Sequence, residues 1–509
     1  MDNSKKYEYE LLKMKRSKEL VLGGFRDFYP ELYQKIERIL RAFREIPKLF
    51  GYIEYECPTV EPLELYELKS GPSLVEETFK VTDRKERQLV LRPETTPSLA
   101  RMLAAQQQYY PRPIRWFSIS RVFRDETQQR GRVKEFWQLN VDILGTEDVA
   151  ADAEVINILA AIILDLDFAP KDFVIRINDR RLIQSFIDEL GLTNYIEIIR
   201  VLDRREKLLQ ETIIDQLTKT GTPAKKAEEI ALKLRHFYIG KQKEKPKLPR
   251  SKKLNELTRQ LPQLQRQALI NALITIGVTQ DAAEKLTDFS AIRGPPIEFL
   301  QAMNEFQLAE ATQQALSPLS QLAKQLDDLG ITDVCEFDAG IARGLDYYTG
   351  IIFEAWDRRS ELPRAIAGGG RYDDLVGIFG GQPLPGTGFG FGETVILELA
   401  EEIGLFPPPE PPADIYLAPV SKKQLSICRE IASNLRAAGI RTIFNGFSWS
   451  LTKHLDDASK RQIPYAAIIG PRELAKKSVN VRDMKSGKEK LVKIAKLAAY
   501  IKAVENQQT

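Results

Sequence analysis

The sequence predicts a multidomain protein of mixed α+β and α/β structure: a sheet core flanked by helices, a helical insertion, and a small C-terminal α/β domain. Three β-rich stretches lie between residues 90 and 145, and strand-like sequence resumes at Glu336 and runs to about residue 395. Between them, residues 180–330 are poor in glycine and show charged helical patterns without an alternating strand. We therefore expect one sheet domain that is interrupted by helices. The 509 residues leave room for roughly three domains of ~150 residues each.

The spacing of apolar residues predicts the individual elements of this core. Residues 31–50 have the spacing of an amphipathic helix, and GYIEYECPTVEPLELY (51–66) alternates like a strand before Pro58. Residues 150–168 are expected to be helical. Further strands are expected in QLVLRPETT, IRWFSISRVFRDE, EFWQLNVDILG and FVIRIND.

A proline-rich segment, FPPPEPPAD (406–414), predicts a stiff linker. After it, IYLAPV, RTIFNG, YAAIIG and VNVRDM are typical of strands, and helical stretches separate them. The predicted order is a tail (1–20), a core domain (21–405) that contains the insertion, the linker, and a C-terminal domain (415–509).

The composition excludes several classes of protein. The net charge is only +3, which argues against histone-like binding of nucleic acid but leaves room for local basic surfaces. The three cysteines form no CxxC pair, and with only two histidines we expect no His- or Cys-based metal site. The N-terminus lacks the apolar core of a signal peptide, and the longest apolar run is too short to cross a membrane. These features predict a soluble protein of the cytoplasm, with no membrane partner.

The stretch IARGLDYYTGIIFEAW (341–356) places Arg343, Asp346, Tyr347 and Tyr348 in front of an apolar, β-prone run. Four hydrogen-bonding side chains at the mouth of a buried strand have two explanations. Either a buried polar network joins two elements, or a polar ligand binds there.

Two further clusters carry candidate site residues. In RVFRDETQQRGRVKEFWQLNVD (121–142), two strands flank a loop, and alternation places Arg124 and Glu126 on one face; a hairpin with solvated charges is the alternative. In LRPETTPSLAR (91–101), Glu94 and two threonines stand between a strand and a helix, where helix capping would explain the threonines without a ligand.

The glycine pattern rules out some nucleotide-binding motifs and suggests another arrangement. No GxxxxGK[ST] is present, and GTGFGFGE (386–393) does not fit GxGxxG because Phe391 stands at the third glycine position. Alternate glycines on a strand leave one face bare, so that either a flat group approaches the backbone or a helix packs tightly on the sheet.

Together these stretches resemble the class II aminoacyl-tRNA synthetases and, among them, the histidyl-tRNA synthetase family. The hairpin is similar to motif 2, with FRDE as its Arg/Glu pair, and GYIEYECPTVEP is similar to motif 1, with Pro58 at its key position. RGLDYYTG and AGGGRYDDLV (367–376) resemble the two signatures peculiar to the family. The resemblance runs from about residue 20 to about residue 500. It implies an antiparallel sheet flanked by helices, a C-terminal anticodon-binding-like domain, and a homodimer formed through residues 31–62.

The resemblance also implies a reaction. Members of the family join L-histidine to ATP, with Mg²⁺, and release pyrophosphate. They then pass the histidyl group from the adenylate to the terminal ribose of histidine tRNA. Negative charge builds at the α-phosphate, so that Arg124 and Arg343 are the expected catalytic residues, one on each side.

The remaining roles are carried over residue by residue. In the nucleotide site, Glu126 would face the adenine amine, Phe136 would stack on the ring, and Arg132 would meet the distal phosphates. In the histidine site, Asp142, Tyr348 and the adjacent Tyr347 would read the imidazole. The full expected sets are Glu94, Thr95, Thr96, Arg124, Gln138, Asp142, Arg343, Tyr347 and Tyr348 for histidine, and Arg124, Glu126, Arg132 and Phe136 for ATP.

The sequence departs from the family pattern at motif 3. That motif normally ends in an arginine that covers the adenine and the terminal phosphate, but here Val395 occupies the position. We expect Arg132, Arg371 or Mg²⁺ to carry the phosphate charge instead. Asp142 also stands where many members carry the longer glutamate.

These departures keep a second function open, a non-catalytic histidine-binding paralogue such as the regulatory subunit of ATP phosphoribosyltransferase. The C-terminal domain argues against it, since such regulators generally lack one. A basic run, GKQKEKPKLPRSKK (240–253), is either a solvated loop or a contact to the tRNA acceptor arm.

Overall fold

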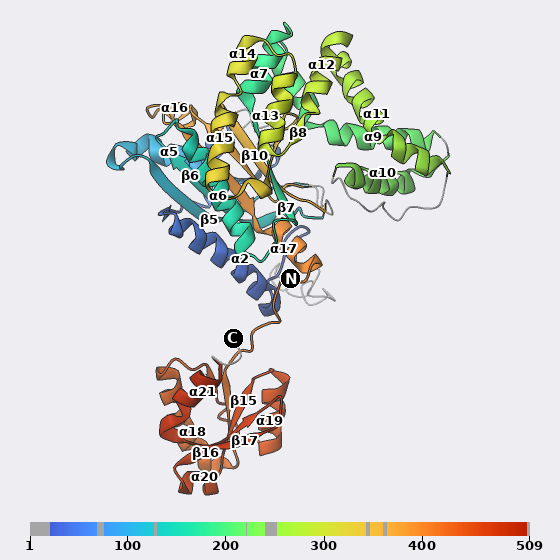
Figure 1. Cartoon of the computed structure of the whole chain (residues 1–509). Coiled ribbons are helices and arrows are strands. Elements are labelled where there is room, and N and C mark those ends of the chain that lie inside the picture. The colour runs from blue at the N-terminus through green and yellow to red at the C-terminus, as the bar shows by residue number, and fades with distance from the viewer. Residues whose placement is uncertain are drawn as a thin grey trace, which may run out of the picture. The chain divides into compact units, whose positions relative to one another are not determined.

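The computed structural model of the chain describes residues 21–68, 76–126, 130–219, 221–239, 252–342, 347–359 and 364–505. These residues belong to two compact units, and the boundary between them in the chain lies between Phe406 and Pro407 (Figure 1). The N-terminal unit (residues up to 406) and the C-terminal unit (residues from 407) each contain a sheet and a hydrophobic core.

Within the described residues, a nine-stranded sheet forms the centre of the N-terminal unit. Its strands pair antiparallel except for β1 with β5 and β7 with β9. In spatial order they are β1 (Ile53–Glu54), β5 (Ile114–Phe123), β6 (Glu135–Leu144), β12 (Gly386–Gly392), β11 (Ala367–Tyr372), β10 (Ile351–Asp357), β7 (Phe173–Asp179), β9 (Cys335–Asp338) and β8 (Arg293–Gly294). The sheet therefore inserts the glycine-rich β12 between β6 and β11, which come from opposite ends of the domain's sequence.

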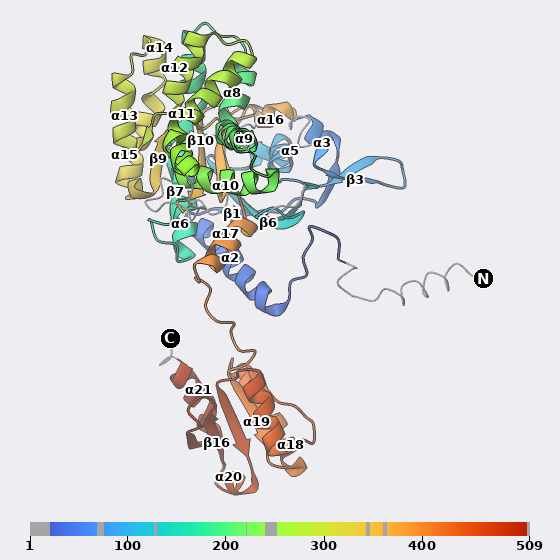
Figure 2. The same cartoon turned by 90° about the vertical axis from the view of Figure 1, so that its right-hand side faces the viewer.

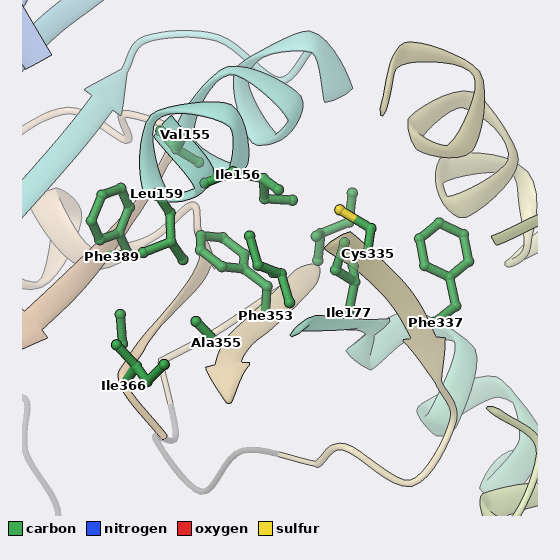
Figure 3. Packing of buried hydrophobic residues seen from close by; sticks show 14 of the residues in the cluster. Val155, Ile156, Leu159, Ile177, Cys335, Phe337, Phe353, Ala355, Ile366 and Phe389 are labelled. Carbon is green, nitrogen blue, oxygen red and sulfur yellow. The ribbon is translucent and has the colours of Figure 1, made fainter. Parts of the chain in front are cut away.

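One face of this sheet is covered by the apolar helix α6 (Val149–Asp165). The helix begins at Asp148, whose side chain accepts a hydrogen bond from the Ala150 backbone N–H at 2.9 Å. Figure 3 shows Leu159 of α6 lying beside Phe353 of β10 and Phe389 of β12, all in the main core. Because side chains alternate along a strand, the polar residues of β6 then lie on the opposite face.

Other helices and a small sheet pack around the nine-stranded sheet. The remaining core helices are α2 (Pro30–Leu49), α3 (Glu64–Glu67), α5 (Thr96–Gln106), α16 (Leu375–Ile378) and α17 (Glu393–Glu402). Among the described residues, a three-stranded sheet has the order β2 (Val60–Pro62), β4 (Gln88–Leu91) and β3 (Phe79–Thr82). β4 leads directly to α5, so that residues 92–96 turn at the edge of the polar face.

The described residues between β7 and β9 are mostly helical, as Figures 1 and 2 show. A group made of α9, α10 and α11 has its own apolar cluster, which includes Leu209, Ile213 and Leu234. Most of the other helices contribute to the main core, for example α15 through Leu319 and Leu322. The bounds are α7 (Arg180–Glu189), α8 (Tyr195–Asp203), α9 (Arg205–Thr218), α10 (Ala224–Ile239), α11 (Lys252–Thr275), α12 (Gln280–Ser290), α13 (Pro296–Glu305), α14 (Glu310–Gln314) and α15 (Ser317–Asp328).

The C-terminal unit is an α/β domain with a mixed sheet. In the described part of the chain its five strands are ordered β14 (Thr442–Ile443), β13 (Ile415–Pro419), β15 (Tyr465–Ile469), β16 (Ser478–Asp483) and β17 (Glu489–Lys493). β13 pairs parallel to β14 and β15, and the other pairs are antiparallel. Its helices are α18 (Leu425–Ala437), α19 (Leu451–Lys460), α20 (Pro471–Ala475) and α21 (Leu497–Glu505).

The predicted fold class is confirmed, and two local expectations need correction. Residues 51–66 do not form one alternating strand: β1 has only two residues, β2 begins after Pro58, and α3 follows. Proline cannot donate to a sheet ladder, which explains the break. The helical region also contains a two-residue strand, β8, which pairs with β9. None of the helices in the described residues has the length and apolar character needed to cross a lipid bilayer.

Candidate active site

A cavity of about 670 Å³ opens on the polar face of the nine-stranded sheet. Strands β6, β10, β11 and β12 contribute to its lining, and Asp203, Arg204 and Lys207 reach it from the α8–α9 corner of the helical region. The cavity brings together most of the site residues expected from the sequence motifs. They are Glu94, Thr96, Arg124, Glu126, Arg132, Phe136, Gln138, Asp142, Tyr347 and Tyr348.

The alternate glycines of β12 make room for side chains of β6. A Cβ on Gly388 would lie 2.2 Å from Oδ1 of Asp142 and 2.5 Å from the carbonyl oxygen of Val141, both closer than any real contact. A Cβ on Gly392 would similarly lie 3.2 Å from the Phe136 ring. Polar and aromatic side chains of the neighbouring strand β6 therefore fill the bare face of β12. Neither of the two expected explanations, a flat group against the backbone or a tightly packed helix, fully accounts for the alternate glycines.

A chain of hydrogen bonds runs along one side of the cavity from Arg124. Its Nε donates to the carbonyl oxygen of Pro93 at 3.0 Å, and its Nη2 donates to Oε1 of Gln138 at 3.3 Å. Gln138 donates to Asn140 at 2.8 Å, and Asn140 donates to the hydroxyl of Thr96 at 3.4 Å. These contacts hold the guanidinium of Arg124 across the Phe136 ring, 5.4 Å from its centroid.

Near this end of the cavity, Glu126 forms an ion pair with Arg132. Burial lowers the pKa of Arg132, and the positive charge of the nearby Arg364 lowers it further. Arg364 also lines the cavity, although it belongs to no recognisable motif. Several guanidinium groups thus surround one region of the cavity, which favours an anionic ligand there.

The opposite end is lined by tyrosines around a buried carboxylate. Tyr372 donates a short hydrogen bond from its hydroxyl to Oδ1 of Asp142, and both side chains are almost fully buried. Burial raises the pKa of Tyr372 well above its ordinary value, and the charge of Asp142 adds to the effect. The ring of Tyr347 lies 4.6 Å from that of Tyr348 and 6.1 Å from that of Tyr372. Sequence reasoning missed Tyr372, although it stands inside the AGGGRYDDLV signature.

Three expected site residues are not seen in the cavity. Arg343 lies outside the described residues. Thr95 is fully buried and is absent from the described lining, and although it stands at the start of α5 its side chain makes no capping hydrogen bond. The expectation that Arg371 carries phosphate charge is wrong: its side chain is paired with Asp152 of α6 at 2.6 Å and is 3% exposed. Because Tyr372 faces the cavity, its neighbour on the strand must face α6.

The described residues contain no group of three or more His, Cys, Asp or Glu side chains arranged to hold a metal ion. The acidic side chains in the cavity are dispersed, and Glu126 is engaged by Arg132. Mg²⁺ that arrives with nucleotide phosphates needs only one or two carboxylates from a protein. The residues present therefore fit a magnesium–nucleotide substrate better than a separate metal centre.

Comparison with known proteins matches both units. The histidyl-tRNA synthetase family model matches residues 24–270 and 213–394, and the anticodon binding domain model matches residues 414–504. The chain belongs to the histidyl-tRNA synthetase family. Among relatives of this family, the histidine–tRNA ligase of Pyrococcus furiosus is 32% identical over 479 residues, which cover 94% of this chain and 98% of the relative. The ligase of Opitutus terrae is 32% identical and covers 91% of this chain and 93% of its own length.

Solved structures of the histidyl-tRNA synthetase family share the fold. The crystal structure of histidyl-tRNA synthetase from Nostoc sp. PCC 7120 matches with a TM-score of 0.73 and 24% identity, over 95% of this chain and 98% of that one. A structure described as an ATP phosphoribosyltransferase regulatory subunit/histidyl-tRNA synthetase from Bacillus halodurans C matches with a TM-score of 0.60 and 22% identity, over 83% and 92%. The class II synthetase fold is thus shown, and the fold alone does not separate ligase from regulator.

Proposed function

We propose that the protein is a histidine–tRNA ligase, which activates L-histidine with ATP and transfers it to histidine tRNA. One observation carries the proposal. A single cavity joins an arginine-lined end, suited to phosphates, to a buried carboxylate ringed by tyrosines, suited to an imidazole. Relatives named as histidine–tRNA ligases match this chain over almost its full length, and the class II ligase activity follows from that family.

In the first step, a carboxylate oxygen of histidine attacks the α-phosphorus of ATP. The bond from that phosphorus to the bridging oxygen breaks, and pyrophosphate leaves with the electron pair. Arg124 would bind the histidine carboxylate and the α-phosphate, since a guanidinium donates to both through its fixed fork. Its contacts to Pro93 and Gln138 orient it before substrate binds. Arg343 is proposed for the opposite side from the family motif alone.

In the second step, a hydroxyl of the terminal ribose of the tRNA attacks the carbonyl carbon of histidyl-adenylate. The bond from that carbon to the phosphate oxygen breaks, and AMP leaves. Mg²⁺ would enter with the nucleotide, where it neutralises charge on the phosphate oxygens.

Histidine would lie with its imidazole between Asp142 and the tyrosines. The carboxylate of Asp142 accepts one ring N–H, while Tyr372 fixes the carboxylate from its other side. Glu94, Thr96 and Gln138 are proposed for the ammonium group. A competitor with a flat apolar ring would leave Asp142 and the neighbouring tyrosine hydroxyls without a polar partner in the ligand, which gives strong discrimination in favour of histidine.

The C-terminal unit supports tRNA as the partner. Its sequence matches the anticodon binding domain model, and on its surface Phe447 is 59% exposed and stacks on Trp449, with ring centroids 5.2 Å apart. Lys453 lies over Trp449 at 4.5 Å. Exposed aromatic rings beside a cation are suited to stacking an unpaired base. A tRNA substrate also supports the cytoplasm, a site of translation, as the proposed location.

A homodimer is proposed through the motif 1 segment. In the single chain, large apolar side chains in this segment stay exposed, among them Tyr33 at 43%, Leu49 at 80% and Ile53 at 66%. Ile53 belongs to β1, which ends the nine-stranded sheet at one edge. Such apolar exposure around a sheet edge favours burial against a second copy.

The test is histidine-dependent ATP–pyrophosphate exchange followed by charging of histidine tRNA. The wild-type protein should catalyse both, and Arg124→Ala should lose at least about 100-fold in exchange rate, because it removes a charged donor from the transition state. Arg130→Ala is the matched control: Arg130 pairs with Glu398 and Glu402 of α17 and does not line the cavity. Folded wild-type protein that binds histidine without exchange or charging would instead indicate the regulatory paralogue.

A further inference from the structure

The segment at the start of α17 contains no cation over the cavity. Val395 stands where motif 3 arginines are expected, is 8% exposed, and lines the cavity with an apolar side chain. Glu393, the first residue of the helix, is fully buried and paired with Arg26. The first turn of α17 can therefore make an apolar contact with a nucleotide but provides no positive charge.

A different arginine reaches the same place from the connection between β10 and β11. The point where a Cβ of Gly131 would lie is 3.5 Å from Cδ of Arg364 and 3.6 Å from Cγ2 of Val395. The stem of Arg364 thus packs on the same glycine as Val395. Two residues further on, the Ile366 backbone N–H donates to the Ala355 carbonyl oxygen at 2.7 Å, which ties this connection to β10.

Arg364 belongs to a group of like charges. Burial lowers its pKa, and the positive charge of Arg124 lowers it further, while Arg364 in turn lowers the pKa of Arg132. These three guanidinium groups all line the cavity. Mutual repulsion of this kind is relieved when a polyanion binds between the cations.

We propose that Arg364 binds the β- and γ-phosphates of ATP together with Arg132, and so supplies the positive charge that Val395 cannot. Val395 then contacts the adenine through its apolar side chain. The inference rests on the proposed function, which provides the nucleotide. Arg371 of β11 is held by Asp152 on the far side of the sheet and cannot take the role.

The decisive comparison uses Arg364→Ala and the Arg130→Ala control, and Arg364→Gln replaces the alanine variant if that variant does not fold. Binding of MgATP and of AMP is measured by protection against thermal unfolding, without histidine. ATP should bind about 10- to 100-fold more weakly to the Arg364 variant, the usual effect of losing a contact to a charged group. AMP, which lacks the distal phosphates, should bind as it does to wild type.

Steady-state exchange gives an independent readout. The KM for ATP should rise by a similar factor in the Arg364 variant, while the KM for histidine stays within about twofold. An ATP affinity within twofold of wild type, or an equal weakening of ATP and AMP, would overturn the assignment. Wild-type protein that binds ATP but shows no exchange with histidine would refute the proposed ligase activity. The comparison of ATP and AMP binding would still test the role of Arg364 in that case.

Discussion

Removal of the Tyr372 hydroxyl tests the histidine end of the cavity. The change Tyr372→Phe keeps the ring, which packs against Tyr347, and removes only the donor to Oδ1 of Asp142. Tyr372 is 2% exposed, so that water cannot readily replace the lost hydrogen bond. The carboxylate of Asp142 would then be held less firmly against the imidazole.

The magnitude follows from the kind of contact that is lost. A hydrogen bond to a charged group contributes ~1.5–3 kcal/mol, which corresponds to a factor of about 10 to 100 in affinity. We therefore expect the KM for histidine in pyrophosphate exchange to rise by about that factor, whereas the KM for ATP stays within about twofold because Phe136, Arg132 and Arg364 lie at the other end.

Tyr52→Phe provides the matched control. Tyr52 is also buried and donates its hydroxyl to a carboxylate, Glu154, at 2.9 Å, but it does not line the cavity. The control should leave both KM values unchanged. If Tyr372→Phe binds histidine as tightly as wild type does, Asp142 does not depend on Tyr372 to read the imidazole and the proposed geometry is wrong.

Three further changes probe other parts of the molecule. Gly388→Ala would place a methyl 2.5 Å from the Val141 carbonyl oxygen and should lower the free energy of unfolding by about 1–3 kcal/mol, whereas Gly377→Ala, which meets nothing within 4 Å, should not. Asp338 is buried, and Asp338→Asn leaves the partly buried Arg205, 2.9 Å away, without its charged partner, which should cost about 3–5 kcal/mol in denaturant unfolding. Burial raises the pKa of Asp338, but the positive charges of Arg205 and other cations outweigh burial, so that its pKa in the folded protein lies below the ordinary value of 3.8. The ionised carboxylate therefore stabilises the fold above pH 3.8. The difference in unfolding free energy between wild type and Asp338→Asn should shrink as the pH falls below that value. Phe447→Ala should raise the KM for tRNA about fivefold or more without change in pyrophosphate exchange, and an unchanged KM would exclude base stacking on this ring.

The sequence by itself determined the kinds of element and most of the candidate site. Local periodicity predicted the helix at 31–50, the strand FVIRIND and the helical region, because amphipathic spacing reflects which side of an element is buried. The resemblance to the family motifs predicted Arg124, Gln138 and Asp142 as site residues, and all three line the cavity.

Only the tertiary structure decided which residues meet across the sheet. Tyr372 and Asp142 are 230 positions apart, and the contact between them exists because β12 separates β6 from β11 and carries glycine at residue 388. From the sequence we expected Arg371 as a phosphate ligand, and no motif pointed to Arg364. The pleat of β11 directs Arg371 to Asp152 on α6, whereas Arg364 precedes the strand and reaches the cavity. Local patterns cannot encode such choices, since they depend on the partners that distant strands and helices bring to each face.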